Sequence, residues 1–222
     1  MLNWLINTDA GLACRIAIGV CIFIALALID LRRNGRAATR WREYAFLLIA
    51  VVAAIAYGAI NDQITSAISW EYFYYAKDLY KTLGPTTPPD MRALHWQAAI
   101  VGAKATWTAG LIIGVALLLA NNPMRDRPRL RNRQLLIYIP LIFLICVAFG
   151  VCFGFFGREG WLNFLSADFQ DMARADIFRP RRFMTTWGVH LGGYVGGGVG
   201  TALAIRKIFS DRSARIPQNP GG

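Results

Sequence analysis

The stretch that decides the fold is residues 187–205, which read WGVHLGGYVGGGVGTALAI. Seven glycines fall between Gly188 and Gly200. In a water-soluble helix each glycine costs about 1 kcal/mol relative to alanine. In a membrane, backbone groups must be hydrogen-bonded within the segment, and a surface without side chains lets a neighbouring helix approach closely. The stretch therefore predicts a membrane helix that packs through its glycines.

The glycines of this helix cover more than one ridge. Four of them repeat at every fourth residue, which is the spacing of a single helix face. The others widen the bare surface, so we expect burial among several helices and not a simple dimer face. The predicted packing residues are Gly188, Gly192, Gly193, Gly196, Gly197 and Gly200.

Composition places the whole chain among integral membrane proteins. Of its 222 residues 55% are hydrophobic, and several apolar runs approach the twenty or so residues needed to cross a bilayer. The net charge of +11 does not indicate a nucleic-acid-binding protein, because the basic residues punctuate the apolar runs. The expected partners are the lipid bilayer and other membrane subunits or further copies of the chain, and no nucleic acid.

The predicted fold is an all-α integral membrane protein with a single transmembrane domain over residues 1–222. Its five-helix transmembrane bundle spans the membrane at residues 12–31, 44–63, 98–120, 135–156 and 185–205. Two long connections, 61–97 and 157–184, mix aromatic, apolar and charged residues, which predicts amphipathic interfacial segments on the outer side.

Basic residues set the predicted orientation. The loops at 32–43 and 121–134 carry five Lys or Arg each and the tail at 206–222 carries four, whereas the other side has three and five in its two longer connections. Short basic segments stay in the cytoplasm. We therefore expect an N-terminus outside, a C-terminus inside and a basic cytoplasmic tail at 206–222.

With this orientation, polar residues of several helices converge at one depth in the outer leaflet. Ionisable groups in a membrane are candidates for function, because burying an unpaired charge is costly. Lys104 is the best single case, although its long stem can also carry its ammonium group to the interface. The candidate polar cluster consists of Asn61, Asp62, Gln63, Thr65, Glu71, Lys104 and His190.

Signals for metal, cofactor or catalysis are weak. His95 and His190 are the only histidines and both lie toward the outer face, so a metal or haem site is a weak alternative to hydrogen-bonded histidines. The four cysteines lie inside apolar runs, which favours core residues over disulfides. No nucleophile motif or phosphate-binding loop occurs, so we predict no catalytic residue, no metal and no cofactor.

The least generic run is residues 63–73, QITSAISWEYF. With Asp62 before it, this run resembles a group of uncharacterised multi-pass bacterial membrane proteins, in which Asp-Gln-Ile-Thr after the second helix leads to Ser-Pro-Glu-Tyr-Phe. Residues 102–107 and the glycine-rich last helix at 190–197 resemble that group as well. Asn61 replaces an expected histidine and Trp70 an expected proline. The resemblance implies a multi-pass topology in a bacterial inner membrane, and no reaction.

Three functions remain open at this point. A non-catalytic accessory or packing component leads, because catalytic motifs are absent and one helix is glycine-faced. Binding or transport of a small solute through the outer-leaflet polar cluster is the alternative. A membrane-embedded enzyme with Glu71 or His190 as general base is the third, and it requires those two groups to lie within reach of each other.

Overall fold

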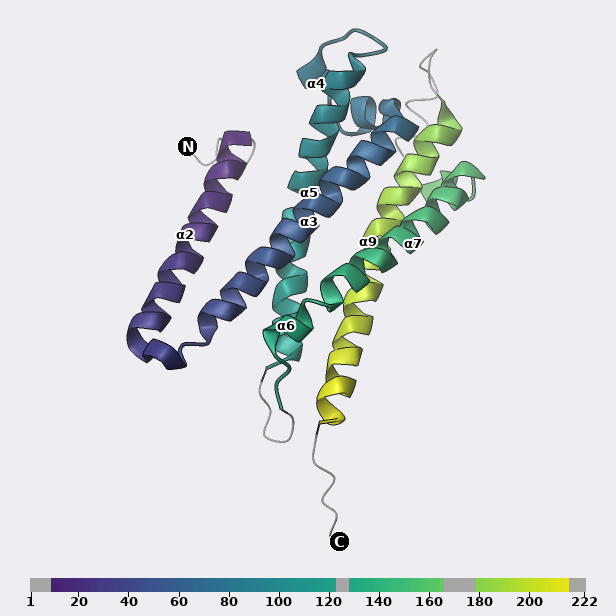
Figure 1. Cartoon of the computed structure of the whole chain (residues 1–222). Helices are drawn as coiled ribbons and strands as arrows, with labels where there is room; N and C mark the ends of the chain where they lie inside the picture. Colours follow the sequence, from purple (N-terminus) through teal and green to yellow (C-terminus); the bar gives the residue numbers. More distant parts are fainter. Residues whose placement is uncertain (1–8, 123–127, 166–178, 216–222) are drawn as a thin grey trace.

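Two antiparallel helix pairs form the body of the structure, a computed structural model (Figure 1). The first pair is α3 (Arg40–Ile68) with α5 (Met91–Ala120), and the second is α7 (Tyr138–Arg158) with α9 (Pro180–Ser213). Contacts between the pairs are far fewer than those within each pair. The two pairs therefore lie side by side and leave room between them.

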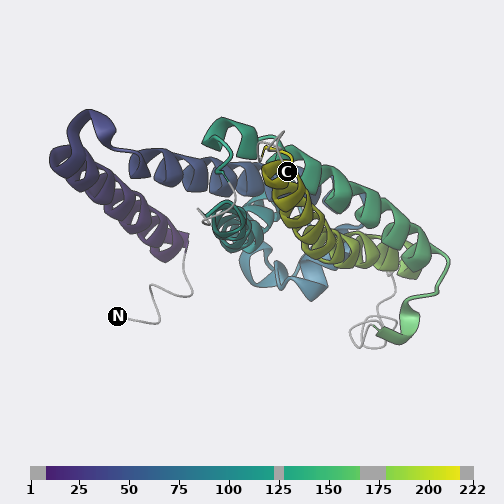
Figure 2. The ribbon, with the colours of Figure 1, turned by 90° about the horizontal axis from the view of Figure 1, so that it is seen from below.

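The first helix, α2 (Asp9–Asn34), stands to one side of these pairs. It joins α3 at one end through the short turn η1 (Gly35–Ala37) and leans away from it along the rest of its length (Figures 1 and 2). Buried Asp30 fixes the junction, because it accepts hydrogen bonds from the Asn34 side chain and from the backbone amide of Arg40. The structure describes residues 9–122, 128–165 and 179–215.

Glycines explain how closely α7 and α9 approach. A β-carbon on Gly188 or Gly192 would overlap a backbone carbonyl oxygen of α7, and one on Gly157 would overlap the Met184 carbonyl of α9. The glycine repeat at every fourth residue is thus the face of α9 that meets α7. Gly150 and Gly154 of α7 lie opposite these glycines. Close backbone approach of this kind is how membrane helices gain van der Waals contact.

The pair of α3 and α5 also packs closely through small residues, a contact that we did not predict. Gly58 and Gly102 face each other so closely that a β-carbon on either would overlap the other's carbonyl group. Further along, a β-carbon on Gly110 would lie 2.6 Å from the Ala54 β-carbon. Small residues therefore allow a short interaxial distance within both helix pairs.

Four helices of the described residues are long and apolar enough to cross a membrane: Ala13–Ala37, Arg40–Ile68, Met91–Ala120 and Asn132–Arg158. They overlap the first four predicted spans; the first begins one residue later than predicted, the third ends at the predicted residue, and the other ends extend further. The last helix, α9, has 34 residues and begins before the predicted span at 185–205. It also continues through Ser213, so the first part of the predicted basic tail is helical.

The connection between α3 and α5 is folded back on the bundle. It contains the π-helix η2 (Tyr72–Ala76) and the short helix α4 (Tyr80–Leu83), and the side chains of Tyr72, Phe73 and Tyr74 are buried. Of the other predicted interfacial segment, 157–184, residues 166–178 lie outside the described residues.

At the opposite end of the bundle, buried Arg212 of α9 holds the end of α5. Its guanidinium group donates to the backbone carbonyl oxygens of Ala120, Asn122 and Pro128. Ala120 is the last residue of α5 and Asn122 lies just beyond it, where carbonyls lack helical partners and a positive charge is favourable. Arg212 thus joins the two helix pairs at this end.

Candidate functional site

A cavity of about 380 Å³ lies between the two helix pairs. Three helices supply most of its walls, α3, α5 and α9, and α7 adds Phe143 and Cys146. Most of the lining is apolar or glycine, and the charged residues gather toward the end near η2. The residues that line this polar end are Asn61, Asp62, Lys77 and His190.

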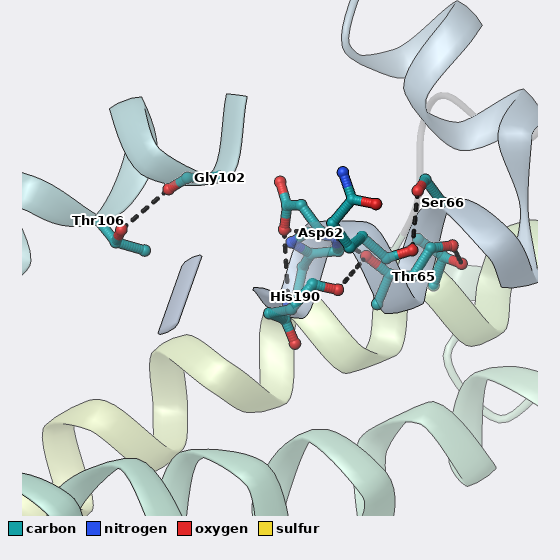
Figure 3. A network of polar contacts seen from close by, with 9 residues as sticks. Asp62, Thr65, Ser66, Gly102, Thr106 and His190 are labelled. Carbon is teal, nitrogen blue, oxygen red and sulfur yellow. Dashed lines mark hydrogen bonds and ion pairs between the residues drawn. The ribbon is translucent and has the colours of Figure 1, made fainter. Parts of the chain in front are cut away.

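Asp62 and His190 form the centre of the polar end, where α3 meets α9 (Figure 3). The Nε2 atom of His190 lies 3.7 Å from Asp62 Oδ1, and both side chains are almost buried. The same Nε2 lies 3.3 Å from the Thr65 hydroxyl. That hydroxyl already donates its single hydrogen to the Asn61 carbonyl at 2.9 Å. His190 therefore carries a hydrogen on Nε2, which it donates to the Thr65 hydroxyl, and Asp62 Oδ1 lies beyond hydrogen-bond distance.

Hydrogen bonds fix one Asp62 oxygen and leave the other available. Oδ1 accepts from the Asn61 side chain at 3.2 Å, in addition to facing His190. Oδ2 has no hydrogen-bond partner among the described residues, and Figure 3 shows it turned away from His190. A β-carbon at Gly102 would lie 2.8 Å from the Asp62 carboxyl carbon. The glycine of α5 thus makes the space in which this carboxylate sits.

Aromatic rings from η2 cover His190. The Tyr72 ring stacks on the imidazole with centroids 4.9 Å apart, and the Phe73 ring meets it edge-on at 5.8 Å. Thr186, one turn before His190, donates to the Thr65 carbonyl at 3.2 Å. The imidazole is thus fixed by α3, by η2 and through its own helix.

The π-helix also delivers Lys77 to the cavity. The Lys77 amide donates to the Tyr72 carbonyl five residues earlier, at 3.2 Å, and this wider turn shifts every following side chain. The Lys77 ammonium lies 5.4 Å from the centroid of the Tyr72 ring, a cation–π contact. It lines the same cavity as Asp62 and His190. Among the described residues it makes no ion pair.

Gln63 and His95, two other residues singled out in the sequence, meet in a separate contact between α3 and α5. The Gln63 side chain donates to the His95 carbonyl of α5. The adjacent Ser66 hydroxyl lies 2.7 Å from His95 Nδ1. His95 and His190 therefore meet neighbouring residues on different sides of α3. Within the described residues no group of three or more His, Cys, Asp or Glu can hold a metal ion.

Neither Glu71 nor Lys104 lines the cavity that contains Asp62 and His190. Glu71 is buried at the start of η2, where one carboxylate oxygen accepts from the Ser69 hydroxyl at 2.9 Å. Its other oxygen has no partner within the described part of the chain. Lys104 does not line the cavity, because it follows Gly102 by two residues and so points about 200° around the helix from it.

Lys77 is the site residue that sequence reasoning missed. A regular α-helical pattern does not place residue 77 beside residues 62 and 190, because the placement depends on the π-helix. The one available signal is the aromatic run Tyr72–Tyr75 directly before the lysine, since aromatic faces attract ammonium groups.

The protein is helical. Four of the described helices can cross a membrane, and a cavity with one polar end lies between the helix pairs. No family model, no curated protein and no solved structure matches the chain.

Proposed function

We propose that this protein is a five-span protein of a bacterial inner membrane that binds a small amphiphilic molecule in the cavity between its helix pairs. The observation that carries the proposal is a cavity of about 380 Å³ with apolar walls and charged groups at one end only. Small-molecule sites commonly have about 300–1,000 Å³, apolar walls and a few convergent polar groups.

The fifth span is α9. Its 34 residues reach about 51 Å at 1.5 Å per residue, more than the roughly 30 Å of bilayer hydrocarbon. Its close contact along α7 supports the same placement. With the basic loops on the cytoplasmic side, Asp62 and His190 lie toward the outer face, and η2 forms an outer interfacial segment beside them.

Exposed lining residues support access to the cavity from the lipid-facing side. Ile112 and Tyr194 line the cavity and are 67% and 61% exposed, and Gly198 beside them is exposed. Their positions on α5 and α9 place an opening between these helices. An amphiphile can enter there with its apolar part in contact with lipid and its polar part near Asp62.

The buried thiol of Cys146 lines the cavity and provides a test. In a protein in which Cys14, Cys21 and Cys152 are serine, we expect 2-phenylethanol to slow modification of Cys146 by N-ethylmaleimide. Gly198→Leu should slow it also, because a β-carbon there meets no atom within 4 Å and the side chain can occupy the opening.

The control retains exposed Cys152 as the single cysteine. Its rate of modification should respond neither to 2-phenylethanol nor to Gly198→Leu. Equal effects on Cys146 and Cys152 would show that the alcohol acts on the detergent or on the whole fold, and the proposal of a binding cavity would then be wrong.

One observation supports the second candidate function, that of a non-catalytic accessory component. In the most apolar part of the first span only 6% of the residues are buried inside the chain, and the helix bearing them leans away from α3. A helix so exposed suits contact with another membrane subunit. Purified protein that remains a lone monomer and brings no subunit with it would oppose this role.

A further inference from the structure

The polar end of the cavity presents two opposite charges that do not pair with each other. Asp62 offers its Oδ2 atom, and Lys77 offers its ammonium group; both residues line the same cavity. Within the described residues they form no ion pair with each other or with another Lys, Arg, Asp or Glu, and His190 lies 3.7 Å from Asp62. Separated opposite charges at one end of an apolar space define the chemistry of a complementary occupant.

We infer that the cavity takes a zwitterion: an ammonium and an anionic group on one small head, attached to an apolar body. This inference rests on the proposed binding function. The ammonium group bonds to Asp62 Oδ2, the anionic group meets Lys77, and the apolar body lies against Ala105, Ile113 and Phe143. Two sources supply this chemistry, namely an apolar amino acid and the head of a zwitterionic phospholipid.

A singly charged occupant fits less well. Burying a charge without a partner in a membrane protein is costly. An amine would satisfy Asp62 and leave Lys77 unmatched, and a carboxylate would do the reverse. A zwitterion satisfies both and leaves the site neutral, as it is when Asp62 and Lys77 are both ionised and His190 is neutral.

The surrounding contacts favour this division of roles. Asn61 donates to Asp62 Oδ1 and His190 faces the same oxygen at 3.7 Å, whereas Oδ2 has no hydrogen-bond partner among the described residues. The Lys77 ammonium lies against the Tyr72 ring. This contact does not satisfy all three N–H donors of the ammonium group. Each charge is thus positioned by its neighbours and still has bonding capacity for a ligand.

The test uses three compounds with the same phenyl tail. Binding of radiolabelled phenylalanine to the purified full chain is competed with phenethylamine, which lacks the carboxylate, and with 3-phenylpropionate, which lacks the ammonium group. We expect each of them to bind at least about tenfold more weakly than phenylalanine, since one charge-assisted hydrogen bond is lost. Equal or tighter binding of either compound would overturn the inference.

Variants assign the two contacts. Asp62→Asn should weaken phenylalanine binding about tenfold or more and reduce the advantage over 3-phenylpropionate, and Lys77→Met should do the same relative to phenethylamine. The matched controls, Asp78→Asn and Lys81→Met, change exposed neighbours and should leave binding unchanged. Variants that retain the elution volume and helical spectrum of the parent and still bind phenylalanine normally would contradict the assignment.

The same assay distinguishes the two sources and separates this inference from the proposed function. In nanodiscs of phosphatidylglycerol, added phosphatidylethanolamine competes if a lipid head is the natural occupant and does not compete if a free amino acid is. Protection of Cys146 by 2-phenylethanol without phenylalanine binding would sustain the cavity and overturn the zwitterion. Absence of both would overturn both.

Discussion

Replacing glycine by alanine at two places on α9 should have opposite results. Gly192 is buried against α7, and a β-carbon there would overlap the Phe149 carbonyl oxygen and lie 2.9 Å from the Gly150 α-carbon. Both obstacles are backbone, so the helices must separate. Overpacking of this kind costs about 1–3 kcal/mol, and alanine recovers at most about 1 kcal/mol of helix propensity. We expect Gly192→Ala to lower the free energy of unfolding by up to about 3 kcal/mol.

Gly198→Ala is the matched control, because its β-carbon would meet nothing within 4 Å. It keeps the gain in helix propensity without the clash, so it should be neutral or stabilising by as much as about 1 kcal/mol. Thermal unfolding of both variants in one detergent, followed by circular dichroism, measures the difference. If both substitutions shift the melting temperature equally, or if Gly192→Ala alters only the oligomeric state, close packing of α7 and α9 within one chain is wrong.

Three further changes follow from contacts elsewhere in the bundle. Arg212→Ala removes a buried guanidinium group with three carbonyl acceptors and should lower the free energy of unfolding by roughly 3 kcal/mol or more. The control Arg206→Ala changes an exposed arginine and should have little effect. Equal melting temperatures of the two variants would contradict the role of Arg212. The hydrogen bond from Lys207 lowers the pKa of Asp211, so this residue stabilises the fold above its unfolded pKa, near 4. That contribution is lost as the pH falls through the folded pKa, and Asp211→Asn should remove this part of the acid dependence of melting; an unchanged dependence would refute it. Gly102→Ala should weaken both phenylalanine binding and the stability of the fold, because the added methyl group displaces the Asp62 carboxylate. Tight binding together with normal stability would contradict the close approach of Gly102 to Asp62.

The part of the fold that follows from the sequence is the part set by local pattern. Apolar runs place four helices able to cross a membrane, because the length of bilayer hydrocarbon fixes the length of the run. The repeat at every fourth residue identifies the face of α9 that meets α7, since residues four apart share a helix face. Gly58 and Gly102 form an equally close contact, but the small residues spaced by multiples of four on these helices mix glycine with alanine, as in Ala50, Ala54 and Gly58, which is a weaker signal than the glycine repeat of α9.

The candidate site followed from the sequence only in part, for a physical reason. The prediction grouped residues by their expected depth along the helices, and Asn61, Asp62, Thr65 and His190 do come together. Depth does not determine rotation about the helix axis, and Lys104 accordingly lies at a suitable depth but does not line the cavity. The position of its counterpart, Lys77, depends on a wider π-turn, for which no simple residue pattern exists.

The glycines of α9 serve two physical roles, and the distinction bears on function. Those at 188, 192, 196 and 200 are needed for contact, because a β-carbon on each would meet α7 within 3.2 Å. Gly193, Gly197 and Gly198 have no such contact: the nearest atom to a β-carbon on the first two is 3.6 Å or 3.7 Å away, and the third meets none within 4 Å. All three line the cavity. Because glycine without a close neighbour gives no packing energy to offset its conformational cost, these three residues are accounted for by the space they leave open. The volume between the helix pairs is therefore a feature that the sequence of α9 specifies, which is the expectation for a binding site and not for a packing defect.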